Sequence, residues 1–318
     1  MFPDNQQSSE AKKKALTVGI AQYIKEIGRG PRGAKPLTRA QATDLFGQVL
    51  DGTVTDLEIG AFCLAMRIKG ETSEEMAGFL DATHARLNRI PATQRPLIVL
   101  PSYNGARKLP VLTPLLALLL AREGLPVLVH GTQTESRRIT ASSVLETLGI
   151  PTMAGVQPIT DGSVAHIDTG VLHPGLKRLL EVRQTVGLRN PGHSVVKLMQ
   201  PGVGTQIVVS SYTHPEYFSM ICDTFATLQM QAVLTRGLEG EVVSDPRRTP
   251  QIHGFVNGEH PALATHQPGP LPHAPGPPPH TDAAPTRDHT PPPPTRPPPV
   301  PESIARQVHH ITTIAARL

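Results

Sequence analysis

Short apolar runs alternate with helical segments between residues 97 and 235, and this alternation constrains the fold more than any other feature of the chain. Runs typical of buried strands cover 97–100, 127–129, 164–167, 206–210 and 232–235. Segments with helical spacing separate them, at 115–123, 141–148, 175–186 and 214–229. Strands separated by helices indicate a mainly parallel sheet that is covered on both faces.

Ligands of such sheets bind at the carboxyl ends of the strands. A binding site is therefore expected among the loops that follow the predicted strands, at 101–114, 130–140, 168–174 and 235–248. The predicted sheet would bring several of these loops to one cleft.

The first 88 residues predict a small helical domain. Three capping boxes, in which Thr is followed three residues later by Gln or Glu, each begin a segment with helical apolar spacing. They lie at 38–41, 55–58 and 72–75, and Gly52 and Gly70 interrupt the chain between the segments. We therefore expect an α/β fold with an N-terminal helical domain, residues 1–88, followed by a mainly parallel-sheet α/β domain, residues 89–257.

Proline marks the segment that follows. Of the 34 prolines in 318 residues, 17 lie between residues 261 and 301, and proline runs favour extended polyproline II because they lack backbone donors. We expect residues 258–301 to form a disordered Pro/His-rich linker, although a local reading-frame disruption would give the same composition. Helical periodicity returns in residues 302–318, which predict a C-terminal helix that docks on the body of the protein.

Composition argues against several classes of protein. Aromatic residues make up 3% of the chain and Trp is absent, which argues against binding that depends on base stacking. Cys63 and Cys222 have apolar neighbours and no metal-binding spacing, so we expect buried, reduced thiols. The longest apolar stretch, 109–121, is too short to span a bilayer, and residues 1–11 do not resemble a signal peptide. We expect a cytoplasmic protein without membrane contact.

A motif between residues 37 and 72 carries a family resemblance. It reads Leu-Thr-Arg from residue 37, Leu-Asp-Gly-Thr-Val-Thr-Asp from 50, Ile-Gly-Ala-Phe from 59 and Ala-Met-Arg-Ile-Lys-Gly-Glu-Thr from 65. This pattern resembles the N-terminal helical domain of glycosyltransferase family 3, which holds anthranilate phosphoribosyltransferase and the pyrimidine nucleoside phosphorylases. The similarity covers roughly residues 12–257. Within it, Pro-Ser-Tyr-Asn-Gly-Ala-Arg-Lys at 101–108 looks like the YbiB-type branch of DNA-binding relatives.

The first strand-end loop departs from the family's catalytic pattern. Catalytic members carry a Gly-Thr-Gly-Gly-Asp-Gly loop whose backbone amides bind the phosphates of phosphoribosyl pyrophosphate, and such amide cradles need glycine. The aligned residues here read Leu-Pro-Ser-Tyr-Asn-Gly and end at Asn104 and Gly105. Pro101 removes an amide donor and Tyr103 adds bulk. In the helix entry that follows, Thr113 alone can still donate.

The second loop and the metal site have also changed. Where the family has Lys-His-Gly, this chain keeps His130 and Gly131 but lacks the lysine that neutralises pyrophosphate. The magnesium-binding Asp-Glu pair aligns with Gly-Glu, which leaves one carboxylate, Glu241, for a metal that needs one or two. Arg183 matches the arginine that meets the carboxylate of anthranilate. The resemblance thus implies a vestigial phosphate and substrate cleft made of Asn104, Gly105, Thr113, His130, Gly131, Arg183 and Glu241.

Phosphoribosyl transfer depends on all three of these altered parts for charge stabilisation. We therefore expect no catalytic residues, no metal ion and no cofactor. One alternative stays open: an active anthranilate phosphoribosyltransferase or nucleoside phosphorylase with a remodelled cleft would bind phosphoribosyl pyrophosphate and magnesium through Glu241.

Basic residues stand where phosphate-binding groups are lost. The net charge is only +4, but residues 12–39 hold eight basic residues and one acid, and paired cations occupy the strand-end loops. Charge focused in this way favours binding of a phosphate backbone. The candidate nucleic-acid contacts are Lys12, Lys13, Lys14, Arg107, Lys108, Arg137, Arg138, Lys177, Arg178, Arg183, Arg189, Lys197, Arg247 and Arg248.

From these residues we expect sequence-tolerant binding of DNA, with RNA as a further partner, across the cleft and along the N-terminal arm. The resemblance adds a homodimer paired through the helical domain. A scaffold protein whose proline tract recruits a partner is the remaining alternative. Sequence alone does not distinguish a preference for single strands, duplex DNA or RNA.

Overall fold

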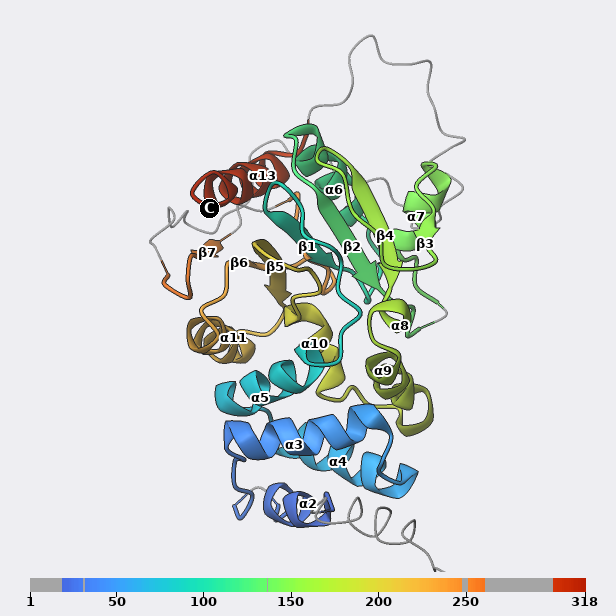
Figure 1. Ribbon diagram of the computed structural model, residues 1–318, viewed down its shortest axis with the longest axis vertical. Coiled ribbons are helices and arrows are strands. Elements are labelled where there is room, and N and C mark those ends of the chain that lie inside the picture. Colours follow the sequence, from blue (N-terminus) through green and yellow to red (C-terminus); the bar gives the residue numbers. More distant parts are fainter. Residues whose placement is uncertain (1–18, 31, 136, 248–250, 261–299) are drawn as a thin grey trace, which may run out of the picture.

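A computed structural model of the protein describes residues 19–30, 32–135, 137–247, 251–260 and 300–318 (Figure 1). A bundle of helices makes up the N-terminal part, and a sheet with helices on both faces makes up the rest. The expected α/β fold is therefore confirmed. Several predicted features lie outside the described residues, namely Lys12, Lys13, Lys14, Arg248 and most of the predicted linker.

Each predicted capping box begins a helix of the N-terminal bundle. In all three boxes the threonine hydroxyl accepts the amide hydrogen of the third helical residue, whose side chain accepts the threonine amide in return. The helices are α2 (Ala21–Ile27), α3 (Arg39–Asp51), α4 (Asp56–Lys69) and α5 (Ser73–His84). Helices α3 and α5 contact the α/β domain, whereas α2 packs on α4 at the far end of the bundle (Figure 1).

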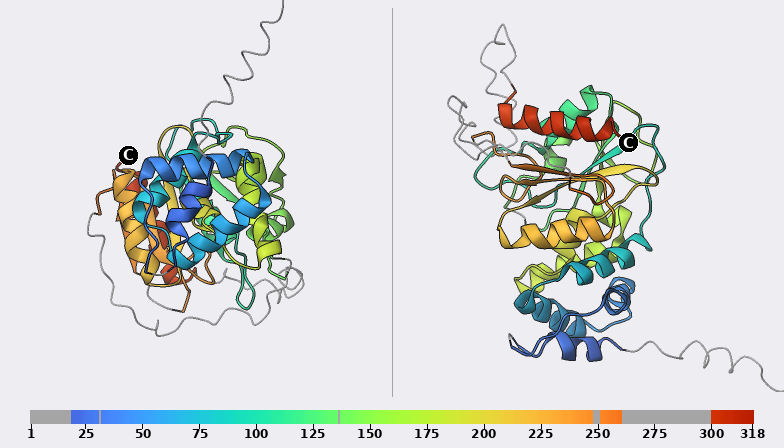
Figure 2. Two further views of the ribbon diagram at one scale, coloured as in Figure 1. Left: turned by 90° about the horizontal axis from the view of Figure 1, so that it is seen from below. Right: turned by 90° about the vertical axis from the view of Figure 1, so that its left-hand side faces the viewer.

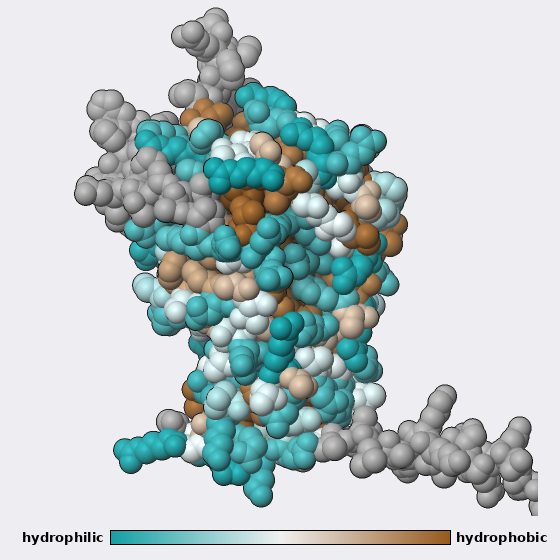
Figure 3. Space-filling model, turned by 60° about the vertical axis from the view of Figure 1, so that its left-hand side comes forward, coloured by the Kyte–Doolittle hydropathy of each residue, from teal (hydrophilic) through white to brown (hydrophobic). Residues whose placement is uncertain are grey.

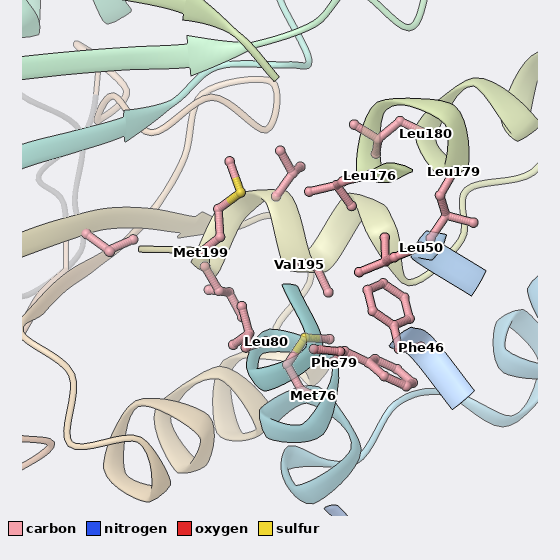
Figure 4. Packing of buried hydrophobic residues seen from close by; sticks show 14 of the residues in the cluster. Phe46, Leu50, Met76, Phe79, Leu80, Leu176, Leu179, Leu180, Val195 and Met199 are labelled. Atoms are coloured by element: carbon pink, nitrogen blue, oxygen red, sulfur yellow. The ribbon is translucent and has the colours of Figure 1, made fainter. Parts of the chain in front are cut away.

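Three phenylalanines hold the bundle together. Phe46, Phe62 and Phe79 come from α3, α4 and α5, and their fully buried rings have centroids 4.6 to 6.2 Å apart. Burying one side chain of this size stabilises the fold by about 2–3 kcal/mol. The same apolar cluster continues across the junction between the domains, where it includes Leu176 and Val195 (Figure 4).

The sheet has seven strands in the order β3-β4-β2-β1-β5-β6-β7, and only the β6–β7 pair is antiparallel. All five predicted strands are present, while β3 and β7 were not predicted. The strands are β1 (Leu97–Pro101), β2 (Val127–Gly131), β3 (Thr152–Met153), β4 (Val164–Asp168), β5 (Gln206–Tyr212), β6 (Ala232–Arg236) and β7 (Ile252–Phe255). Their side chains alternate between two apolar clusters, one on each face of the sheet.

Helices cover both of these faces (Figures 1 and 2). The layer toward the helical bundle contains α8 (Thr169–Leu172), α9 (Pro174–Val186), α10 (Gly192–Leu198) and α11 (Glu216–Thr227). The opposite layer contains α6 (Thr113–Arg122), α7 (Ala141–Thr147) and α13 (Glu302–Ala315). The short helix α8 falls within a predicted loop, because four residues are too few to show helical periodicity.

The helix α13 packs against α6 and β7. Ile304, Ile311 and Ile314 on its apolar side are fully buried. The side-chain amide of Gln307 donates to the carbonyl oxygen of Val242 at 2.7 Å, and its own oxygen accepts the amide of Ser244 at 2.9 Å. Through these two hydrogen bonds, α13 holds the backbone of the segment that connects β6 to β7.

Three smaller observations concern the membrane, the thiols and the surface. Nowhere in the described ranges is a helix long and apolar enough to cross a bilayer.

Cys63 is buried, and burial raises the pKa of its thiol to about 12. Cys222 is only half-buried, which corrects the expectation for that residue. Hydrophilic residues cover most of the face shown in Figure 3, with apolar residues exposed in small patches.

The first prediction concerns a histidine that caps α9. His173 accepts the amide of Leu176 at 3.2 Å through Nδ1, and burial, with the nearby charge of Arg86, lowers the pKa of His173 from 6.5 to about 4. The unfolded chain therefore takes up a proton between these pH values that the folded chain does not. The free energy of unfolding should fall as the pH drops from 6.5 to 4, by at most about 1.4 kcal/mol per pH unit for this group.

Urea unfolding over this pH range measures the effect, and His173→Asn is the matched control because asparagine also caps helices but does not titrate. The variant should show a shallower pH dependence than the wild type. An equal pH dependence in both proteins would show that His173 already binds its proton in the folded state.

Candidate functional site

The loops that follow β1 and β2 pair with each other through their backbones. Ala106 donates its amide hydrogen to the carbonyl oxygen of Ile139 at 2.8 Å, and Ile139 donates in return at 3.0 Å. The loops meet because β1 and β2 are parallel neighbours whose carboxyl ends lie at the same edge of the sheet. Four basic residues, which we call the strand-end cations, flank this bridge in the chain: Arg107, Lys108, Arg137 and Arg138.

Three of the strand-end cations are open to a ligand. Arg107, Lys108 and Arg137 are exposed, and none of them forms an ion pair within the described part of the chain. Arg138 is partly buried and pairs with Glu135 at 2.9 Å. Arg183 pairs with the same carboxylate. Burial opposes ionisation of Glu135, but hydrogen bonds from the two arginines outweigh it and lower the pKa of this carboxyl.

A buried carboxylate occupies the centre of the loop after β1. Glu241, only 2% exposed, accepts the backbone amides of Asn104 at 3.1 Å and Gly105 at 2.8 Å. It also accepts the hydroxyl of Thr113 at 2.9 Å and the hydroxyl of Ser102. Four donors converge on one carboxylate, which is the arrangement that protein loops use to bind an anion.

A second carboxylate from the same turn binds the next part of the loop. Glu239 accepts the backbone amides of Arg107 at 2.9 Å, Lys108 at 3.2 Å and Leu109 at 3.3 Å. The turn between the two glutamates is tight, since a Cβ at Gly240 would collide with the side chain of Asn104 and its φ is +87°. Only glycine fits there.

Of the other predicted contacts, Lys177 and Arg247 pair with carboxylates, whereas Arg178, although exposed, binds backbone oxygens of the helical domain. Lys177 lies 3.5 Å from Asp168, and Arg247 pairs with Asp245 at 2.9 Å. Exposed pairs of this kind contribute little stability, so both cations stay accessible to a polyanion. Arg178 instead donates to two backbone carbonyl oxygens at the end of α3. It therefore joins the two domains and does not belong to the strand-end surface.

Arg189 and Lys197 line a cavity of about 500 Å³ between the domains. Three of the four tyrosines in the chain, Tyr103, Tyr212 and Tyr217, also line it. The ammonium of Lys197 donates to the carbonyl oxygen of Ser211 at 2.5 Å. Burial, together with the nearby charge of Arg189, lowers the pKa of Lys197 to about 8. Both cations are partly buried in this half-open pocket, and the guanidinium of Arg189 donates to Asn104 Oδ1 of the loop after β1 at 2.5 Å.

Sequence reasoning missed this gathering of tyrosines, because it considered only the low aromatic content of the chain. A usable signal existed: Tyr103 and Tyr212 each stand at the carboxyl end of a strand, where parallel sheets bind ligands. Tyr103 is buried with its ring edge-on to His193 at 5.8 Å, so it fills space beside the loop after β1.

The N-terminal cations lie far from the strand ends. Lys25 belongs to α2, Arg29 lies just after it, and Arg32 and Lys35 follow in the chain. The helices α3 and α5 separate α2 from the sheet (Figure 1). The described part of the N-terminal arm therefore does not adjoin the strand-end cations, and the three predicted lysines of residues 12–14 lie before the first described residue.

Comparison with known proteins identifies the family. Residues 21–86 match the helical bundle domain of a glycosyl transferase family. The uncharacterized protein YbiB of Escherichia coli K12 is 40% identical over 239 residues, which span 73% of this chain and 75% of that protein. The chain belongs to the YbiB family.

More distant relatives share the fold. An anthranilate phosphoribosyltransferase from Beijerinckia indica is 31% identical over 177 residues, which cover 54% of this chain and 52% of the enzyme. The crystal structure of anthranilate phosphoribosyltransferase from Thermus thermophilus superimposes with a TM-score of 0.58 at 20% identity, covering 73% of this chain and 70% of that one. This YbiB-family chain therefore has an anthranilate phosphoribosyltransferase-like fold.

The magnesium ion implied by that likeness does not fit the residues present in this member of the YbiB family. Glu241, the one aligned carboxylate, accepts four hydrogen bonds from the chain itself, which saturates the oxygen lone pairs that a metal would need. Nor do the described residues contain a group of three His, Cys, Asp or Glu side chains that could hold a metal ion. The amides that would bind phosphate are likewise occupied.

The end of β2, where the resemblance places the second phosphate-binding segment, is tightly packed. His130 is fully buried, and burial lowers its pKa to about 3, so its ring is neutral. Neither of its ring nitrogens has a hydrogen-bond partner. A Cβ at Gly131 would collide with the carbonyl oxygen of Ser102, so the two loops are in close contact. His130 and Gly131 therefore serve packing here.

The second prediction tests whether Glu241 acts as an internal anion. Glu241→Ala leaves two amides and two hydroxyls without their acceptor, and each such buried group costs about 1–3 kcal/mol. We expect the melting temperature to fall, and inorganic phosphate to restore part of the loss by binding the vacated donors. Thermal unfolding with phosphate or chloride at equal ionic strength measures this.

Glu216→Ala, which removes an exposed carboxylate from α11, is the matched control. Phosphate should stabilise this variant no more than the wild type. If phosphate raises the melting temperature of all three proteins equally, Glu241 does not occupy an anion site.

Proposed function

We propose that this protein binds DNA without sequence preference through the strand-end cations, and that RNA is a further partner. One observation carries the proposal: the bridge between Ala106 and Ile139 gathers basic residues from two loops, and three of them are exposed and without an ion pair among the described residues. Lys177, which lines a small cavity with residues at the ends of β1 and β2, and Arg247, which interacts electrostatically with Glu239, extend the candidate surface. Clustered cations of this kind bind the phosphate backbone, which carries no base information.

The position of the tyrosines supports binding that tolerates any sequence. Tyr103 and Tyr212 are buried and line the cavity between the domains, so they do not offer their rings to bases at the strand-end surface. Contacts with phosphates remain the main source of affinity there, and such contacts weaken as salt competes for the backbone.

The third prediction combines salt dependence with charge reversal. With four to six phosphates neutralised, the affinity for mixed-sequence DNA should fall roughly a hundredfold to a thousandfold between 50 and 200 mM salt. Replacing Arg107, Lys108, Arg137 and Arg138 by Glu should weaken binding to all sequences alike. A gel shift over a salt series, with single-stranded DNA, duplex DNA and RNA, measures both effects.

Reversing Arg122 and Arg317, two exposed arginines at the end of α6 and after α13 that belong to neither strand-end loop, is the matched control. Binding that ignores salt, or that survives the fourfold reversal, would contradict the proposal. Magnesium-dependent binding of phosphoribosyl pyrophosphate in calorimetry would instead favour the alternative of an enzyme with a remodelled cleft.

We also propose that two copies pair through α4. Leu57, Leu64 and Ile68 are 85%, 47% and 59% exposed and lie seven and four residues apart, so they form one apolar stripe along the helix. The opposite side of α4 is buried and includes Phe62 and Met66. A second copy of the same stripe is the partner of matching chemistry, as the family resemblance implies for the helical domain.

The fourth prediction follows from this stripe. Leu64→Glu combined with Ile68→Glu should convert a dimer to a monomer, because charged side chains would be buried without partners. Light scattering during gel filtration measures the mass. Leu118→Glu, at a 40% exposed leucine on α6, is the control and should leave the mass unchanged. A wild-type protein that is monomeric at high concentration would contradict the pairing.

A further inference from the structure

The backbone under two of the strand-end cations has an unusual set of hydrogen-bond partners. Arg107, Lys108 and Leu109 lie between β1 and α6, outside any helix or strand. Their three consecutive amides all donate to the carboxylate of Glu239, at 2.9 to 3.3 Å. These residues are 130 to 132 positions from Glu239 in sequence, so the contact fixes the loop against a distant turn.

The turn that carries Glu239 is itself firmly held. Glu239 has a φ of +50°, a left-handed conformation that a non-glycine residue adopts only where its surroundings impose it. Two residues further along the chain, Glu241 is anchored in its four hydrogen bonds. Just beyond Glu241 in the chain, Gln307 of α13 binds the backbone of Val242 and Ser244. The backbone of this turn is therefore fixed, and the side chain of Glu239 projects from a rigid part of the chain.

We propose that Glu239 is a positioning residue for nucleic-acid binding: its carboxylate fixes the backbone of residues 107–109 and so presents Arg107 and Lys108 to the phosphate backbone. This inference rests on the proposed function. Three amides converging on one carboxylate leave the two basic side chains on the exposed side of the loop. A loop fixed before binding loses less conformational entropy when it meets its ligand.

Removal of Glu239 is expected to weaken the binding of DNA, although it removes a negative charge. Glu239 is a negative charge beside cations, and Arg247 also senses it electrostatically. If charge alone mattered, removing Glu239 would strengthen the binding of a polyanion. If Glu239 positions the loop, its removal weakens binding, because the two cations no longer share one fixed geometry. A purely electrostatic role and a positioning role of Glu239 therefore predict opposite changes in the affinity for DNA.

The fifth prediction uses this difference. Glu239→Ala should bind mixed-sequence DNA about three- to tenfold more weakly than the wild type, and the slope of log affinity against log salt should fall by up to about two, as if two phosphate contacts were lost. Glu239→Gln keeps one oxygen that can accept an amide, so it should lie between the alanine variant and the wild type. Fluorescence anisotropy over a salt series gives both quantities.

Glu181→Ala is the matched control. Glu181 is an exposed carboxylate on α9 that lines a small polar cavity together with Lys177 and the loops after β1 and β2. Removing it takes away the same charge near the same surface without touching the backbone of residues 107–109. This control should bind DNA as tightly as the wild type or up to about twofold more tightly.

Amide hydrogen exchange separates this proposal from the proposed function. In Glu239→Ala the amides of residues 107–109 should exchange faster, while the apolar cores of both domains exchange as in the wild type; in Glu181→Ala all should stay unchanged. If the wild type does not bind nucleic acid, the proposed function fails while faster exchange still shows that Glu239 holds the loop. Unchanged exchange, or DNA binding by Glu239→Ala that is equal to or tighter than that of the wild type, overturns the positioning role.

Discussion

The buried carboxylate of Glu241 is the contact on which the strand-end geometry depends. Its charge is removed from water, and four hydrogen bonds from the loop after β1 and the start of α6 compensate for that cost. Those same donors stand where the resemblance places a phosphate site. Because the loop satisfies them with a side chain of this protein, it needs no ligand to be ordered, and it keeps one shape in the absence of any substrate.

Four separate segments act together around this contact. The turn after β6 supplies both glutamates, the loop after β1 supplies the amides, the loop after β2 pairs with that loop through Ile139, and α13 supports the turn through Gln307. Hydrogen bonds therefore connect the loops that carry the cations to the turn after β6 and, through that turn, to α13.

Sequence predicted the scaffold better than the site. Capping boxes and apolar runs are local signals, so the helices α3 to α5 and the five main strands were predicted correctly, and the parallel sheet implied that the strand-end loops converge. The sequence also showed that the loop after β1 lacks most of the glycines that bind phosphate in the catalytic members of the resembled family. The sequence did not reveal that Glu239 and Glu241 accept the amides of this loop, because those amides lie 130 or more residues away in the chain. For the same reason, sequence could not show that Arg178 joins the domains.

The internal carboxylate also shapes which evolutionary changes are open to this chain. Placing glycine at Tyr103 alone would leave Glu241 among the amides, and replacing Glu241 alone would leave buried donors unsatisfied while Pro101 still lacks an amide hydrogen. Each substitution taken singly lowers stability before it can help to form a phosphate site. A phosphate cradle in this loop would therefore need changes at Pro101, Tyr103 and Glu241 together, because any one of them alone leaves the site blocked or its donors unsatisfied.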